Sequence, residues 1–134
     1  MEKIKIILVD DEVLFRKGIA YLLQSEKNIE VVFEAENGEE LINYLRLTHD
    51  FPDVILMDLH MPKLDGYQVS SVIKSDETNI NYTTPIIAFT ASVSDSILAD
   101  IRAVGMKDFI YKPFNIDEMY TKLRNIKGIL NPKA

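Results

Sequence analysis

The sequence predicts an α/β domain built around a parallel β-sheet. Short apolar runs rich in β-branched residues recur along the chain, and the segments between them carry apolar residues that repeat every three to four positions. This alternation is typical of βα units, in which each helix leads the chain to the next parallel strand. At 134 residues and 47% apolar composition, the chain has the length of one compact domain with its own core.

The predicted strands are short apolar runs. The clearest is Val54 to Met57, because four consecutive apolar residues indicate a strand that is covered on both faces of the sheet. In chain order, strands are predicted at Ile4 to Asp10, Ile29 to Ala35, Val54 to Asp58, Pro85 to Phe89 and Asp108 to Tyr111.

The predicted helices lie between and after these strands. The last one is the best defined, since its apolar residues form a single stripe and Asn115 with Glu118 resembles a capping signal. Gly105 stands where the fourth helix should end with a left-handed residue. The stripe comprises Ile116, Met119, Tyr120, Leu123 and Ile126. In chain order, helices are predicted at about residues 13–25, 38–48, 66–75, 93–104 and 115–126.

One domain is expected over residues 1–127, with residues 128–134 as a tail or the start of a linker. The net charge of −6 argues against direct binding to nucleic acid or to an anionic membrane. The sequence contains no cysteine, which excludes disulfides and thiolate metal sites and is compatible with a reducing cytoplasm. It also has no uninterrupted apolar run of membrane-spanning length, so we expect a cytoplasmic chain.

The strand at residues 54–58 ends on a carboxylate, Asp58. A charge at the end of a buried strand costs several kcal/mol unless it is paired or binds a cation. Ligands of open parallel sheets bind beyond the carboxyl ends of the strands. The other polar residues at these ends are Asp10, Asp11, Thr90 and Lys112.

Three carboxylates gathered at one edge repel one another unless a divalent cation lies among them. Because all the candidate ligand atoms are oxygens, the sequence favours Mg²⁺, with Mn²⁺ as the alternative, over zinc. A hydroxyl at Thr90 and an ammonium at Lys112 are suited to contact the oxygens of a phosphoryl group. We therefore expect Asp58 to carry a phosphoryl group.

These residues stand in four stretches, "ILVDDE" (7–12), "ILMDLHMPKLDG" (55–66), "PIIAFTA" (85–91) and "DFIYKPF" (108–114). With these stretches the sequence resembles the receiver (CheY-like) domain of two-component response regulators, from about Lys3 to Ile126. The resemblance implies a flavodoxin-like, doubly wound (βα)5 three-layer sandwich whose five-stranded parallel sheet has the strand order 2-1-3-4-5.

The resemblance also implies a role for each residue of the site. Asp58 would be the phosphoacceptor, taking a phosphoryl group from a phosphohistidine of a partner. Asp11 and Asp58 would bind Mg²⁺ through their carboxylates, Asp10 would do so through a water molecule, and His60 would contribute its backbone carbonyl. The domain's own chemistry would be limited to this transfer and to later hydrolysis of the acyl phosphate.

Signal output is implied by the same resemblance. Thr90 and Lys112 would hold the phosphoryl oxygens, and Phe109 would be the aromatic switch residue, which turns inward when the threonine moves. The partner would be a histidine kinase or a histidine phosphotransfer protein. The fourth helix, fifth strand and fifth helix would form the output face and a homodimer interface. Since position 109 is Phe, no hydroxyl can relay the signal there.

Each residue taken alone also has an ordinary structural interpretation. Taken alone, Asp10 and Asp11 could equally well cap a helix or bind a metal ion. Glu12 is most simply an acidic residue in the first turn of a helix. Thr90 alone would be a capping or turn residue, and Lys112 a surface lysine. The functional interpretation depends on the whole combination.

Several alternatives for the whole chain remain at this stage. They are a receiver-like interaction module that is never phosphorylated, an aspartyl-phosphate hydrolase of the haloacid dehalogenase type, and a flavin-binding domain. The acidic cluster argues against the last, because it would repel the phosphate group of the flavin. The receiver could stand alone or belong to a longer protein such as a hybrid sensor histidine kinase, and the wording of "GMKDFIYKPF" (105–114) favours the latter.

Overall fold

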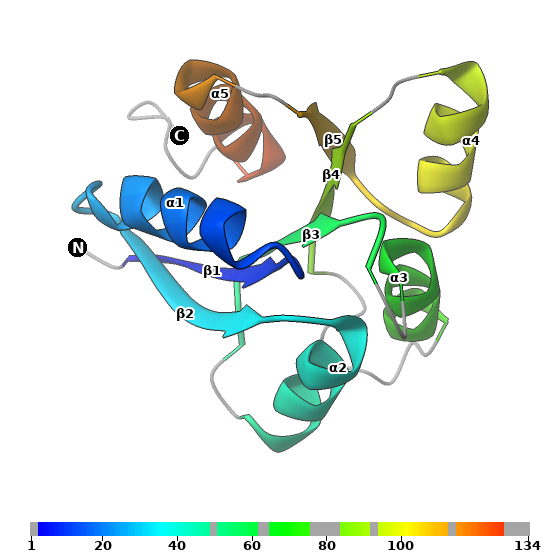
Figure 1. The fold of residues 1–134 in the computed structure, drawn as a ribbon, viewed down its shortest axis with the longest axis horizontal. Helices are drawn as coiled ribbons and strands as arrows, with labels where there is room; N and C mark the ends of the chain where they lie inside the picture. Colours follow the sequence, from blue (N-terminus) through cyan, green and yellow to red (C-terminus); the bar gives the residue numbers. More distant parts are fainter. Residues whose placement is uncertain are drawn as a thin grey trace.

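In the computed structural model, the strands form one parallel sheet with the order β2-β1-β3-β4-β5 (Figure 1). The structure describes residues 3–48, 51–61, 65–75, 84–91, 94–112 and 115–127. The strands are β1 (Ile4–Val9), β2 (Ile29–Ala35), β3 (Val54–Asp58), β4 (Ile86–Thr90) and β5 (Asp108–Tyr111). The helices are α1 (Val13–Gln24), α2 (Gly38–Leu47), α3 (Gly66–Lys74), α4 (Asp95–Ala103) and α5 (Ile116–Lys127).

Helices cover both faces of the sheet, as Figure 1 shows. On β1, Ile6 and Leu8 pack with residues of α1 and α5, whereas Ile7 and Val9 on the opposite face pack with residues of α2, α3 and α4. This alternation follows from the two-residue period of a strand. The predicted flavodoxin-like three-layer architecture and its strand order are confirmed.

β3 occupies the centre of the sheet between β1 and β4. All five of its residues are buried, as expected for a strand covered on both faces. Asp58 lies in register with Phe89 of β4. The last residue of β3 therefore stands at the carboxyl edge of the sheet, near the ends of β1 and β4.

The boundaries of the helices and strands agree with those predicted from the sequence to within two residues. β4 ends at Thr90, one residue later than predicted, because Thr90 still pairs with Tyr111 of β5. Gly105 has φ of 83° and follows α4, as predicted for a left-handed residue. Asn115 accepts a hydrogen bond of 2.7 Å from the backbone N–H of Glu118 at the start of α5.

The polar connection over residues 76–83 and the predicted tail over residues 128–134 lie outside the described residues. Among the helices that are described, none has the length and apolar character needed to span a bilayer.

Candidate phosphoryl and metal site

Three carboxylates converge at the carboxyl edge of the sheet. Asp10 and Asp11 follow the end of β1, and Asp58 ends β3, which is the neighbouring strand. One carboxylate oxygen from each lies within 4.8 Å of the others, and Asp10 and Asp58 are 2% and 6% exposed. Two buried carboxylates and the exposed carboxylate of Asp11 at this separation are a donor set that suits a hard divalent cation. The predicted acidic cluster is therefore present and fits a metal site.

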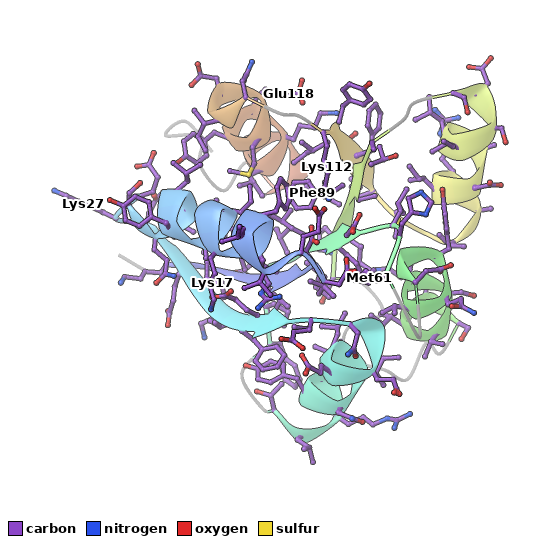
Figure 2. All side chains as sticks on the ribbon, viewed as in Figure 1. Lys17, Lys27, Met61, Phe89, Lys112 and Glu118 are labelled. Atoms are coloured by element: carbon purple, nitrogen blue, oxygen red, sulfur yellow. The ribbon has the colours of Figure 1, made fainter. Side chains whose placement is uncertain are left out.

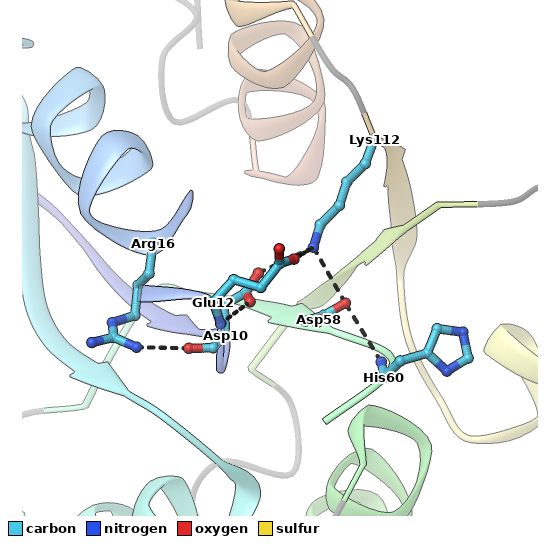
Figure 3. A network of polar contacts seen from close by, with 6 residues as sticks. All are labelled: Asp10, Glu12, Arg16, Asp58, His60 and Lys112. Atoms are coloured by element: carbon cyan, nitrogen blue, oxygen red, sulfur yellow. Dashed lines mark hydrogen bonds and ion pairs between the residues drawn. The ribbon is translucent and has the colours of Figure 1, made fainter. Parts of the chain in front are cut away.

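Lys112 reaches this cluster from the end of β5 (Figure 3). Its Nζ lies 3.2 Å from Oδ2 of Asp10 and 3.5 Å from Oδ1 of Asp58. Its backbone N–H donates a hydrogen bond of 2.7 Å to the carbonyl of Thr90, which continues the β4–β5 pairing by one residue. The pairing of these strands thus fixes the point from which the lysine side chain extends.

Burial and the proximity of the carboxylates change the pKa values of the charged groups in the site. Burial, reinforced by the negative charges of Asp10 and Asp11, raises the pKa of Asp58 to about 6, although Lys112 and the N–H of His60 act in the opposite direction. Burial also raises the pKa of Asp10. Burial opposes the charge on Lys112, but Asp58 and Asp10 outweigh it and raise the pKa of the lysine. The site is therefore short of positive charge, as expected for a cation site.

Two aromatic rings lie beneath the lysine. Lys112 Nζ is 4.3 Å from the ring centroid of Phe15 and 6.0 Å from that of Phe89. The two rings meet edge to face with centroids 5.5 Å apart, and Figure 2 shows Lys112 next to Phe89 between α1 and α5. Cation–π contact favours the ammonium above these rings. No sequence signal distinguished Phe15 from other apolar residues of α1.

The site opens to solvent through a pocket of about 270 Å³. Thr90 is 1% exposed at the end of β4, and the residue after it, Ala91, lines the pocket. The structure therefore brings the acids and Lys112 together directly, with Thr90 one residue away from the pocket wall. The lining residues are Asp11, Glu12, Asp58, His60, Ala91 and Lys112.

His60 contacts Asp58 through its backbone. Its N–H donates a hydrogen bond to Oδ1 of Asp58 at 3.5 Å, while its imidazole ring points away from Asp58 (Figure 3). The ring is exposed. The expectation that its carbonyl is a metal ligand stays a prediction.

A buried arginine, Arg16, binds the acidic loop, which is the turn of residues 10–12 between β1 and α1. The sequence analysis missed this residue. Arg16 Nη1 donates a hydrogen bond of 2.7 Å to the backbone carbonyl of Asp10, and its Nε pairs with Glu34 of β2 at 3.1 Å. Its position on α1 held a usable signal, because Arg16 falls on the same stripe as the buried Ile19 and Leu23. A charged residue on the apolar face of a helix indicates a specific buried partner.

The expectation for Glu12 requires a correction. Glu12 is the N-cap residue of α1, so it precedes the first helical turn, and its side chain makes no capping hydrogen bond. Instead, Oε1 of Glu12 lies 3.4 Å from Lys112 Nζ. The lysine opposite, which is distant in sequence, attracts the carboxylate away from the helix end.

Phe109 lies on β5 and is half-buried against the core on the side of α3 and α4. Lys122 of α5 places its Nζ 4.2 Å from the ring centroid of Phe109 and 3.1 Å from Oδ1 of Asp108. That same oxygen accepts the backbone N–H of Phe109 at 2.8 Å. Charged contacts from α5 thus hold the aromatic residue at the edge of the sheet.

A parallel sheet with an acidic cluster and a lysine at its carboxyl edge is typical of one class of signalling domain. Comparison with known proteins identifies the family. Residues 6–124 match the family model described as response regulator receiver domain. The chain belongs to that family, as the sequence analysis predicted. Receiver domains in general interact with histidine kinases or phosphotransfer proteins.

Relatives of known name carry this domain as part of longer chains. The chain is 39% identical, over 89% of its length, to a protein-glutamate methylesterase/protein-glutamine glutaminase of Clostridium acetobutylicum, and it spans 34% of that protein. It is 31% identical, over 98% of its length, to the sensory transduction protein LytT of Oceanobacillus iheyensis, and it spans 51% of that protein.

Solved structures agree with the fold. The receiver domain of the sensor histidine kinase PA1611 from Pseudomonas aeruginosa PAO1, which has a magnesium ion coordinated in its active-site cleft, is 29% identical with a TM-score of 0.80. That match covers 94% of this chain and 98% of the other. The phosphorylated cyanobacterial phytochrome response regulator RcpA is 28% identical with a TM-score of 0.78, covering 98% of this chain and 96% of its own.

Proposed function

We propose that this receiver domain accepts a phosphoryl group on Asp58 from a phosphohistidine of a partner protein, with Mg²⁺ or Mn²⁺ bound beside it. The observation that carries the proposal is the position of Asp58, which lies at the end of a buried strand, within 4.8 Å of two other carboxylates and 3.5 Å from Lys112. The magnesium in the PA1611 receiver supports the choice of ion.

The cation would be held by Asp11 and Asp58 directly, by Asp10 through water, and by the carbonyl of His60. Carboxylate oxygens and a carbonyl suit magnesium, which keeps several water ligands. When bound, the ion would offset the charge of the carboxylates and of the incoming phosphoryl oxygens.

In the transfer, a carboxylate oxygen of Asp58 forms a bond to phosphorus while the P–N bond to the donor histidine breaks. The electron pair of that bond leaves with the imidazole nitrogen. Lys112 is 15% exposed in its side chain and already in contact with Asp58, so a small shift would pair its ammonium with a phosphoryl oxygen. Thr90, at the end of the adjoining strand, would donate its hydroxyl to another oxygen.

Thr90 and Phe109 would transmit the change. Converting a carboxylate into a phosphoryl dianion adds charge next to Thr90, and movement of that residue would open space for the ring of Phe109. Moving a two-state surface from mostly off to mostly on requires roughly 5 kcal/mol of differential binding. The proposed output face consists of α4, β5 and α5, through which a homodimer or another partner would bind.

Intact-protein mass spectrometry tests the proposal. The chain is incubated with acetyl phosphate and Mg²⁺, and one phosphoryl adduct is expected. Asp58→Asn should remove the adduct, and so should a chelator. Asp53→Asn is the matched control, because Asp53 precedes the opposite end of β3 and accepts the N–H of Lys5 at 2.9 Å.

Other results would identify the alternatives. An adduct that persists in Asp58→Asn would place the chemistry elsewhere. Steady turnover of a small phosphate ester would favour the hydrolase. No adduct from acetyl phosphate or from any phosphohistidine donor, with Mg²⁺ shown to bind, would favour an interaction module that is not phosphorylated.

A further inference from the structure

Glu12 is a feature of the site that the proposed phosphoacceptor role leaves unused. It occupies the N-cap of α1, where a side chain ordinarily accepts a backbone N–H, yet it makes no such bond. Its side chain is 65% exposed, lines the pocket and reaches Lys112 at 3.4 Å. Glu12 therefore contacts Lys112 at the solvent-exposed part of the pocket wall, which forms the pocket mouth.

Lys112 contacts three carboxylates among the residues that the structure describes, and these carboxylates differ in kind. Asp10 and Asp58 belong to the cluster that would hold the cation. Glu12 lies outside that cluster, and its exposed carboxylate lines the pocket beside Lys112. The Glu12 carboxylate would repel small anions, and it would compete with phosphoryl oxygens for Lys112.

We propose that Glu12, placed at the pocket mouth against Lys112, is a specificity-determining residue that disfavours small dianionic phosphoryl donors relative to a donor delivered by a protein. The inference rests on the proposed phosphoacceptor role of Asp58. A protein donor brings binding energy from its own contact surface, which offsets the repulsion, whereas a free dianion has no such compensation.

The size of the effect follows from Coulomb's law. A single carboxylate a few ångströms from a dianion in a largely aqueous pocket should lower productive binding about three- to tenfold. A monoanion should be affected by about the square root of that factor, because the interaction energy scales with charge. Salt should weaken both effects, since the carboxylate is exposed.

The test compares two donors of different charge on wild type and on Glu12→Gln. Near neutral pH acetyl phosphate is a dianion and phosphoramidate a monoanion. With Mg²⁺ present, Glu12→Gln should speed adduct formation about three- to tenfold with acetyl phosphate and about two- to threefold with phosphoramidate. The difference between donors should shrink at high ionic strength.

Glu30→Gln is the matched control, because it changes the net charge equally but lies near the start of β2, at the opposite end of the sheet. Equal acceleration by both donors, a comparable gain in Glu30→Gln, or a slower reaction in Glu12→Gln would overturn the proposal. The last result would mean that Glu12 positions Lys112 for the reaction.

A second measurement separates this inference from the phosphoacceptor role. Sulfate, a dianion that cannot be transferred, is titrated into the Mg²⁺-loaded protein and followed through the backbone amide signals of Ala91 and Lys112. Glu12→Gln should tighten sulfate binding about three- to tenfold. If this occurs while no variant forms an adduct, the charge effect at the mouth stands and the phosphoacceptor role fails. Unchanged sulfate binding overturns the inference.

Discussion

Arg16 donates a hydrogen bond from Nη1 to the backbone carbonyl of Asp10 at 2.7 Å, so a buried cation on α1 fixes the main chain of the acidic loop. The same guanidinium pairs with Glu34 of β2. One residue therefore ties the loop, the first helix and the edge strand together.

Arg16→Met should lower the free energy of unfolding by about 2–4 kcal/mol, because it leaves a buried carbonyl and a half-buried carboxylate without this partner. It should also weaken Mg²⁺ binding. Urea unfolding and a Mg²⁺ titration measure the two effects. Lys17→Met is the control, since Lys17 also pairs with Glu34, at 3.2 Å, but is 61% exposed in its side chain. Its cost should stay below about 1 kcal/mol, and equal losses would contradict the prediction.

Asp58→Asn should stabilise the metal-free protein. Burial raises the pKa of Asp58 from its ordinary value of 3.8 to about 6 in the folded state, so the folded state binds the proton more tightly. The stability of wild type therefore falls as pH rises through this window and is level above it. At pH about 7.5, the uncharged variant should be more stable by about 1–3 kcal/mol.

Urea unfolding in the presence of a chelator checks this at two pH values. The advantage of Asp58→Asn should disappear below pH about 3, where the wild-type carboxyl is protonated in both states. Saturating Mg²⁺ should reduce the advantage, because the ion binds the folded wild type. A variant less stable than wild type without metal would contradict the electrostatic account of Asp58.

Gly66→Ala should disturb the packing of the start of α3 against the end of β3. An added Cβ would lie 2.5 Å from the backbone oxygen of Asp58 and 3.0 Å from Cα of Leu59, which no ordinary contact allows. We expect a loss of about 1–3 kcal/mol in urea unfolding. Gly18→Ala is the control, because Gly18 has nothing within 4 Å of an added Cβ. At this exposed position of α1, the substitution should gain about 0.5–1 kcal/mol.

Lys122→Met should release the ring of Phe109. The substitution keeps the length of the side chain but removes the ammonium 4.2 Å from the ring and its ion pair with Asp108. The ring signals of ¹³C-labelled Phe109 should shift, with a stability loss of about 0.5–1 kcal/mol. Lys122→Arg should largely preserve the wild-type signals. An unchanged ring spectrum in Lys122→Met would show that packing alone positions Phe109.

The sequence predicted the elements well because each depends on local patterns. Alternating apolar runs and helical stripes placed the strands and helices, and Gly105 marked its left-handed turn. The carboxyl-edge rule also placed Asp58 and Lys112 in one site, since the direction of parallel strands determines which ends meet.

The parts that sequence reasoning missed depend on side chains meeting across the fold. The local rule for an N-terminal acid predicted that Glu12 would interact with the first turn of the helix. Its side chain instead contacts Lys112, which lies 100 residues further along the chain. The role of Phe15 depends on the same lysine lying over its ring. Local propensity carries no information about such pairs.

The central position of β3 determines how freely the main chain of Asp58 can move. Its backbone is paired on both sides, with β1 and with β4, and none of its side chains reaches solvent appreciably. Such a strand exchanges its amide hydrogens only when the whole domain unfolds. The main chain under Asp58 is therefore a rigid support, and the proposed adjustment to a phosphoryl group would fall on residues outside β3.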